Sequence, residues 1–301
     1  MSATDWLLLI VLSVLWGGSF YFAKIAVVEI PPLTLALGRV AIAAAALAVV
    51  ARILGLTWPH DTRTWANFIV MAAFNNALPF TLLFWGQIHI SIGLAAILTG
   101  TSPLFGALMA HVMTEDDKLT ASRTVGVLAG LIGIIVLIGV DVLGEFGSHV
   151  LAEFACLVAA ASYGFGAVYS RRVRRLPPMI VAAGQLTMST VLLLPLVLLF
   201  DRPSAVLTAS WPALASMLAL ALVCSALAYL IYFRVIGRAG ATNALLVTFL
   251  VPISAIVLGI LSLGERLEAH QMAGMVAIFI GIVAIDGRPI RWLARMLPRG
   301  G

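Results

Sequence analysis

Long apolar stretches, each about as long as a membrane-spanning helix, follow one another along the chain. A helix crosses the hydrocarbon core of a bilayer with about 20 mostly apolar residues. Charged residues, proline and glycine divide the sequence into ten such stretches: 6–27, 32–53, 65–87, 92–113, 120–140, 150–170, 178–200, 212–235, 241–262 and 269–287. The pattern predicts an all-α membrane protein with ten transmembrane helices.

The second half of the sequence repeats the first. A shift of 149 residues, the separation of Pro103 and Pro252, also aligns Thr99 with Thr248. An internal repeat of this length usually determines the architecture. We expect three parts, namely a first five-helix repeat, a second five-helix repeat and a basic cytoplasmic tail, at 1–143, 149–287 and 288–301.

Five helices per repeat is an odd number, so the second repeat must enter the membrane from the opposite side. Inverted repeats of this kind recur in carriers that work by alternating access, and their substrate site lies near the membrane midplane between the repeats. The sequence therefore predicts two inverted five-helix repeats around a central cavity.

Composition supports the membrane assignment and gives an orientation. The chain of 301 residues is 62% hydrophobic and only 10% charged, whereas soluble domains are about 25% charged. With both termini in the cytoplasm, most of the 18 lysines and arginines fall in cytoplasmic segments; the exceptions are Lys24, Arg39, Arg202 and Arg266. This asymmetry predicts an N-in, C-in, multi-pass protein of the cell's inner (cytoplasmic) membrane.

The charged and sulfur-containing residues show no pattern of a cofactor site. The net charge of +5 arises at the expected membrane edges, so we expect no nucleic-acid partner. Cys156 and Cys224 fall inside predicted helices, and the histidines lack metal-ligand spacing. We therefore expect no cofactor and no metal.

Arg39 is a cation near the centre of a predicted helix. It lies four residues from Ala43, or roughly 6 Å along a helix. A guanidinium facing lipid at that depth would cost several kcal/mol, so it must face protein or water. Either it locks helices together by pairing with carbonyls or with a carboxylate such as Glu29 or Glu153, or it borders a permeation path. Lys24 lies nearer a helix end and is expected to reach the outer surface.

Four residues are candidate hinge positions, although each could instead serve helix packing alone. Proline cannot donate a hydrogen bond to the carbonyl four residues earlier. Two helices should therefore bend near the midplane and expose a threonine carbonyl that a neighbouring hydroxyl, water or a ligand can satisfy. Small residues let helices approach closely. The hinge candidates are Pro103, Pro252, Gly17 and Gly164.

Neutral polar and aromatic residues lie at comparable depths in several predicted helices. A cavity of this composition suits an amphipathic, neutral or zwitterionic solute with an apolar body. No carboxylate lies near a helix midpoint, which disfavours proton antiport through a central acidic residue. The candidate cavity residues are Trp16, Ser19, Phe20, Arg39, Asn75, Asn76, Pro79, Phe80, Thr99, Thr101, Tyr163, Gln185, Ser225, Tyr229 and Thr248.

These features resemble a known family. Trp16-Gly17, Arg39, the run 95–103 and above all the run 240–274 resemble the tandem EamA-type repeats of the drug/metabolite transporter superfamily. The resemblance implies a ten-helix inner-membrane carrier that exports amino acids or other small metabolites. YddG-type exporters of aromatic and other apolar amino acids are the most similar group.

Together these observations predict a monomeric carrier that exports small amphipathic metabolites, most of all apolar amino acids, down their gradient by alternating access. Its expected partners are a small-molecule substrate and membrane lipid. A proton-coupled transporter of other metabolites or drugs, and a channel, remain alternatives. An intramembrane enzyme is disfavoured because no nucleophile, base or metal ligands gather at one depth.

Overall fold

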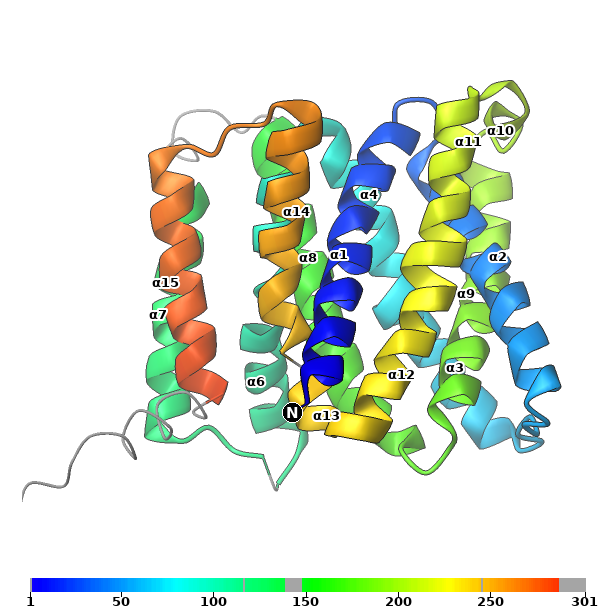
Figure 1. The fold of residues 1–301 in the computed structure, drawn as a ribbon, viewed down its shortest axis with the longest axis horizontal. Helices are drawn as coiled ribbons and strands as arrows, with labels where there is room; N and C mark the ends of the chain where they lie inside the picture. The colour runs from blue at the N-terminus through cyan, green and yellow to red at the C-terminus, as the bar shows by residue number, and fades with distance from the viewer. Residues whose placement is uncertain (1, 116, 139–147, 245, 287–301) are drawn as a thin grey trace, which may run out of the picture.

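The computed structural model describes the chain except for residues 1, 116, 139–147, 245 and 287–301. The described residues form helices and connecting turns, with no strand among them. Figure 1 shows one bundle in which the long helices lie side by side along a common direction. The predicted tail at 288–301 lies outside the described residues.

Most of the bundle consists of helices of membrane-spanning length. Eight helical stretches are long and apolar enough to cross a membrane, and two shorter apolar helices, α14 and α15, follow. This confirms the prediction of an all-α membrane protein. The elements are α1 (Ala3–Ala26), α2 (Pro32–Ile53), α3 (Thr62–Ala72), η1 (Ala73–Ala77), α4 (Leu78–His89), α5 (Ile92–Thr99), α6 (Ser102–Met113), α7 (Ala121–Ile138), α8 (Ser148–Tyr169), η3 (Ser170–Val173), α9 (Pro178–Phe200), α10 (Ala205–Thr208), α11 (Trp211–Leu218), η4 (Ala219–Leu227), α12 (Ala228–Ala239), α13 (Ala241–Ala244), α14 (Val247–Leu263) and α15 (Ala269–Asp286).

Local sequence accounts for several helix ends. Ser91 caps α5, because its hydroxyl accepts a hydrogen bond from the Leu94 N–H at 3.2 Å. Asp61 caps α3 in the same way through the N–H of Thr64, at 2.7 Å. At the other extreme, α14 stops at Gly264, whose φ of +65° lies in the left-handed region that favours glycine.

Two π-helical turns, η1 and η4, interrupt the helices at equivalent places in the two halves. The 149-residue shift carries η1 into η4. Pro79 accounts for the first turn, because it cannot donate to the carbonyl of Asn75. In the second, the Ser225 hydroxyl donates to the Leu220 carbonyl five residues back, at 2.9 Å. Such turns are rare and are often found at functional sites; the sequence pattern did not predict them.

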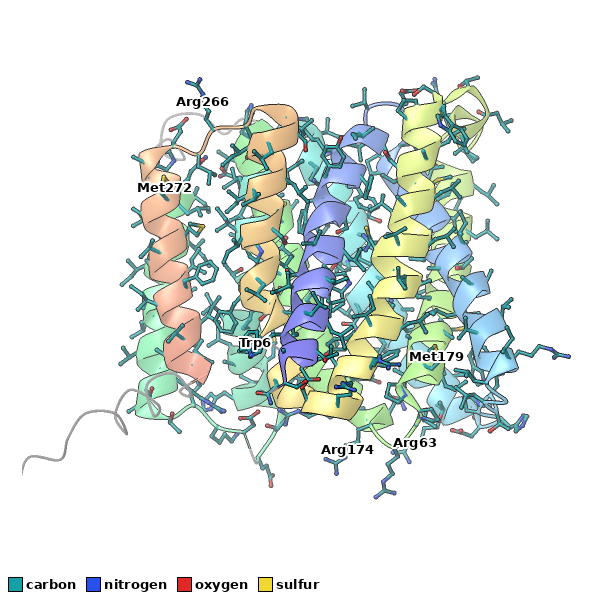
Figure 2. The ribbon with its side chains drawn as sticks, in the orientation of Figure 1. Trp6, Arg63, Arg174, Met179, Arg266 and Met272 are labelled. Carbon is teal, nitrogen blue, oxygen red and sulfur yellow. The ribbon has the colours of Figure 1, made fainter. Side chains whose placement is uncertain are left out.

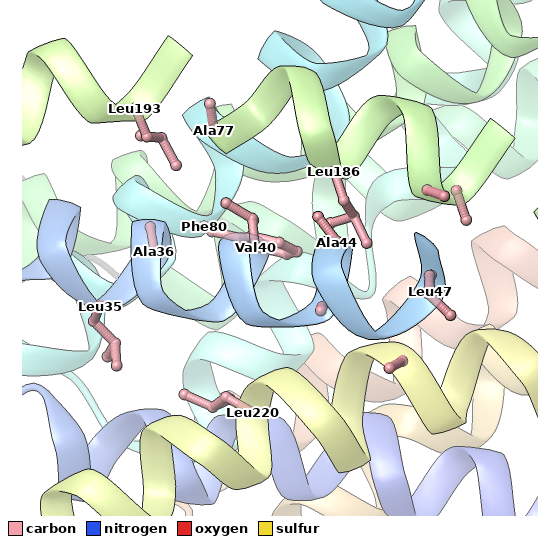
Figure 3. Close-up of a cluster of buried hydrophobic side chains, with 14 of the residues drawn as sticks. Leu35, Ala36, Val40, Ala44, Leu47, Ala77, Phe80, Leu186, Leu193 and Leu220 are labelled. Atoms are coloured by element: carbon pink, nitrogen blue, oxygen red, sulfur yellow. The ribbon is translucent and has the colours of Figure 1, made fainter. Parts of the chain in front are cut away.

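The largest buried cluster surrounds α2, which packs against α9, η4 and α4. Val40 and Ala44 of α2 lie together with Phe80 of α4 and Leu186 of α9 (Figure 3). Small residues such as Ala36 let the neighbouring helices approach closely. The core therefore lies where helices of the first half meet helices of the second.

The two ends of the bundle carry different side chains. Arg63 and Arg174 lie at the end where α1 begins, together with Trp6, whereas Arg266 lies at the opposite end (Figure 2). At one side of the bundle, α7 and α15 pack closely against each other (Figure 1).

Candidate functional site

Arg39 joins the two halves of the chain. Its side chain is 7% exposed, and its Nε donates a hydrogen bond to the Ser225 hydroxyl in η4 at 3.0 Å. The guanidinium carbon lies 4.0 Å from the centroid of the Phe80 ring in α4, a cation–π contact. Of the carboxylates considered as partners, Glu29 instead accepts hydrogen bonds from the backbone and hydroxyl of Ser210. Arg39 therefore packs on an aromatic ring and bonds a hydroxyl.

A second polar contact joins the halves through Gln185 of α9. Its amide oxygen accepts a hydrogen bond from Asn75 Nδ2 in η1 at 3.2 Å, and its amide nitrogen donates to the Tyr229 hydroxyl at 3.4 Å. Tyr229 stacks on Phe233, with ring centroids 5.8 Å apart. Here an amide takes the place of the guanidinium.

The two contacts occupy equivalent positions in the repeat. A shift of 146 residues, the separation of Arg39 and Gln185, relates their centres, and the 149-residue shift relates their surroundings. The equivalent pairs are Arg39 with Gln185, Phe80 with Tyr229, Phe84 with Phe233, and Asn76 with Ser225. The stacked pair Phe80–Phe84, at 6.2 Å, matches the stacked pair Tyr229–Phe233. One arrangement thus occurs twice, once around a cation and once around an amide.

Asn76 breaks this correspondence. By analogy with Ser225, it is the residue expected to bond Gln185, but Asn75 makes that bond instead. Asn76 is fully buried, and neither its amide nitrogen nor its amide oxygen has a partner within the described residues. A buried polar group without a hydrogen bond costs about 1–3 kcal/mol. Such a group needs an explanation, and a ligand is one.

Gly17 and Gly164 mark equivalent close contacts between helices. A Cβ on Gly17 of α1 would lie 2.8 Å from the backbone nitrogen of Ala255 in α14. A Cβ on Gly164 of α8 would lie 2.6 Å from the backbone nitrogen of Gly106 in α6, and the 149-residue shift relates Gly106 to Ala255. Both glycines therefore serve close packing, and a hinge function for them stays a prediction.

The two prolines do not act alike. α5 ends at Thr99, and α6 begins at Ser102, so Pro103 lies in a first turn, where its missing N–H costs little. The Ser102 hydroxyl donates to the Thr99 carbonyl at 2.6 Å, as expected for a carbonyl that proline has freed. Pro252 instead lies inside α14. The helix is thus interrupted beside Pro103 and a hydroxyl satisfies the freed carbonyl, whereas the bend itself stays a prediction.

The remaining predicted cavity residues divide by location. Tyr163 and Tyr229 both pack against the buried cluster around α2. The hydroxyls of several others donate to carbonyls three or four residues earlier in the chain: Ser19 to Trp16 at 2.7 Å, Thr99 to Ala95 at 2.7 Å, and Thr101 to Leu98 at 2.6 Å. The rest lie in or beside packing contacts: Trp16 against Tyr232, Phe20 in a buried cluster with α5 and α8 residues, Pro79 buried in α4, and Thr248 half-buried in α14.

Lys24 has a structural function that the sequence did not indicate. Its Nζ donates to the carbonyls of Gln87 and Ile90, at 2.6 and 2.9 Å, where α4 ends. Lys24 is half-buried beside these carbonyls, and its extension to the outer surface stays a prediction. A cation is favourable at this position since the C-terminal end of a helix carries partial negative charge.

Glu265 is a further structural residue, which the sequence had identified only as part of a family motif. Its carboxylate accepts hydrogen bonds from the backbone N–H groups of Ile92 and Gly93, at 2.8 and 3.2 Å. A carboxylate at a helix N-terminus meets unbonded donors and partial positive charge. The connection after α14 is thereby fixed to the start of α5.

Two carboxylates outside the spanning segments have pKa values below the ordinary range. Hydrogen bonds from Ser210 lower the pKa of Glu29. Asp117 pairs with both Arg123 and Arg171, the latter at 2.6 Å, and these hydrogen bonds lower its pKa. Both carboxylates therefore connect segments distant in sequence.

Comparison with known proteins decides the family. The model of the EamA-like transporter family matches the chain twice, at residues 5–139 and 150–285. The chain belongs to this family. EamA-like membership, together with the apolar helices, makes it a multi-pass membrane transporter of the drug/metabolite type.

Relatives of this EamA-like chain are similar over nearly their whole length. The uncharacterized transporter YoaV of Bacillus subtilis is 26% identical, with 91% of this chain and 94% of that protein covered. A probable amino-acid metabolite efflux pump of Salmonella typhimurium is 27% identical, covering 98% and 99%. A probable terminal-alkyne amino-acid exporter of Streptantibioticus cattleyicolor is 25% identical, covering 96% and 95%. One solved protein structure superposes with a TM-score of 0.66 at 19% identity, covering 98% of this chain and all (100%) of the other, which shows a shared fold.

Proposed function

We propose that this protein exports small amphipathic metabolites, most of all amino acids with aromatic or other apolar side chains, by alternating access. The observation that carries the proposal is the pair of equivalent contacts Arg39–Ser225 and Gln185–Asn75. Each contact joins one half of the chain to the other, so a movement between the halves changes both. A site between two repeats is the arrangement that alternating access uses.

The proposed architecture has ten membrane spans in two inverted five-helix repeats, at 1–143 and 149–287, with both termini in the cytoplasm. The family model, which matches twice, and the equivalent positions of the π turns and close glycines support it. The N-in orientation is supported by Arg63 and Arg174 at the end where α1 begins (Figure 2). We place the protein in the inner membrane as a monomer.

The chemistry of the cluster supports an amino-acid-like substrate. It offers one cation, neutral amides and hydroxyls, and the rings of Phe80 and Tyr229. Such a set fits a solute with a small polar head and an apolar body. Relatives named as an amino-acid metabolite efflux pump and an amino-acid exporter support the same class.

We further propose that the substrate gradient alone drives export. Proton antiport commonly uses an acidic residue within the membrane. Among the described residues, Arg39 and Gln185 have hydroxyl, amide and aromatic neighbours, and no carboxylate bonds to either.

The test is flux in proteoliposomes that contain the purified, full-length protein. Tryptophan and threonine should exchange in saturable counterflow, at the same rate with and without an imposed pH gradient. Linear, non-saturable flux would identify a channel, and flux that requires the pH gradient would establish proton coupling. Absence of flux for every amino acid tested would refute amino-acid export.

A further inference from the structure

The hydrogen-bonding capacity of Arg39 is only partly used inside the protein. A guanidinium has five N–H donors. Nε bonds Ser225, and the guanidinium lies over the Phe80 ring. Within the described part of the chain, the two Nη groups donate no hydrogen bond and no carboxylate pairs with the cation. The edge of this buried guanidinium that carries the Nη groups, which is the edge that binds anions, therefore has no partner among the described residues.

Lys24 shows how a structural cation in these helices is satisfied. Its ammonium bonds two carbonyls, those of Gln87 and Ile90. Removing a cation from water costs several kcal/mol, and close partners must offset that cost. Lys24 has such partners within the protein, whereas Arg39 has one hydroxyl and an aromatic face.

Asn76 supplies an independent observation, one helical turn before the Phe80 ring that Arg39 contacts. It precedes Phe80 by one helical turn, and residues four apart lie on the same side of a helix. Its side chain is fully buried, with neither amide atom bonded to a described residue. The side of the helix that carries the Arg39-binding ring thus also carries an unused donor and an unused acceptor.

We propose that Arg39 binds the carboxylate of the transported substrate. The two Nη groups form the fork that matches a carboxylate in plane, the Phe80 ring fixes the orientation of that fork, and Asn76 bonds the polar group next to the carboxylate. This inference rests on the proposed export function and narrows its substrates to carboxylates. For an amino acid, the group next to the carboxylate is the α-ammonium, whose N–H donates a hydrogen bond to the Asn76 amide oxygen.

The test compares each acid with its amide in binding and counterflow by the full-length protein. The probes are L-tryptophan with L-tryptophanamide, L-threonine with L-threoninamide, and indole-3-acetate with indole-3-acetamide. Wild-type protein should bind the acid at least about 10-fold more tightly, because hydrogen bonds to charged groups contribute about 1.5–3 kcal/mol. Arg39→Gln should weaken the acid about 10- to 100-fold and leave the amide within about twofold. Arg39→Lys should restore part of the preference, since it keeps the charge but loses the fork.

Arg52→Gln is the matched control, because it removes an exposed cation from the same helix. It should keep the wild-type preference. If wild-type protein handles amides as well as acids, or if Arg39→Gln keeps the preference, the carboxylate site is wrong. The wild-type comparison decides alone if Arg39→Gln does not fold. A preference for indole-3-acetate without any response to amino acids would support the site and refute amino-acid export.

Discussion

The two polar contacts that join the halves of the chain have equivalent positions but different chemistry. Around Arg39, a cation bonds a hydroxyl and lies on a phenyl ring; around Gln185, an amide bonds an amide and a phenol. Two cations at these positions would repel each other, whereas two amides would carry no charge at all. Of the two equivalent contacts, only the one at Arg39 therefore carries a charge.

The backbone contacts between helices are more alike in the two halves than the polar side chains are. Gly17 and Gly164 make equivalent helix contacts, and η1 and η4 interrupt equivalent helices. Backbone geometry is thus repeated where the helices pack, whereas the side chains differ at the Arg39 and Gln185 contacts. Each of the following predictions compares one position with its equivalent in the other half.

The largest effect is expected at the close glycines. Gly17→Leu and Gly164→Leu should each destabilise the protein by about 3 kcal/mol, the upper end of typical overpacking costs, because backbone lies within 3 Å of either new Cβ. Thermal unfolding in detergent measures the loss. Gly18→Ala is the control, since the atoms nearest its Cβ are 3.9 Å away. A large loss of stability at only one of the two glycines would contradict the equivalence of the two helix contacts.

A smaller and unequal effect is expected at the polar contacts. Ser225→Ala should cost about 2 kcal/mol, because it leaves the buried Arg39 Nε unpaired, whereas Asn75→Ala should cost about 1 kcal/mol, because its bond is neutral. The same unfolding measurement compares them. Equal losses would mean that the cation adds nothing to the contact. Thr187→Ala is a control, since its hydroxyl bonds only its own helix.

The prolines should differ in their effect on transport rate. Pro252→Ala restores a backbone N–H inside α14 and should slow counterflow about threefold, or about 0.7 kcal/mol in the barrier, if movement uses that interruption. Pro103→Ala lies in a first turn and should leave the rate nearly unchanged. If the two variants slow transport equally, the position of the proline within its helix does not matter for the transport rate.

The sequence was sufficient for features that depend on composition and repetition. Apolar length located the helices, and Arg39 was identified because a cation at that depth needs a partner. The partner itself was not predictable: Ser225 is distant in sequence and meets Arg39 only when η4 packs on α2. Glu29 was a reasonable candidate, but it accepts its hydrogen bonds from Ser210.

Other features leave little trace in hydrophobic periodicity. A π turn shifts the helix register by a single residue, and only Pro79 hinted at the first of them. The bonds of Glu265 to the start of α5 depend on how two connections meet in space. A carboxylate directly after the helix-ending Gly264 was the available signal.

The smallest effect is expected at the ends of the bundle. There Asp117 bonds Arg171, whereas Lys24, which the repeat aligns with Arg171, bonds the carbonyls of Gln87 and Ile90. The pKa of Asp117 lies below its ordinary 3.8 in the folded protein, so its contribution is full above that pH and is lost as the pH falls further. Exposed ion pairs contribute about 0–1 kcal/mol and weaken with salt. Asp117→Asn should therefore reduce thermal stability slightly at neutral pH and low salt, and this reduction should shrink as the pH falls below 3.8 or as the salt rises to 1 M.

Glu29 supplies the matched case without an ion pair among the described residues. Its pKa is also lowered, but by hydrogen bonds from neutral Ser210, so its contribution should fall with acid in the same direction and hardly respond to salt. Glu29→Gln and Asp117→Asn, unfolded across pH at low and high salt, separate the two mechanisms. If salt removes the effect of Glu29→Gln as fully as that of Asp117→Asn, long-range charge rather than local hydrogen bonding holds both connections.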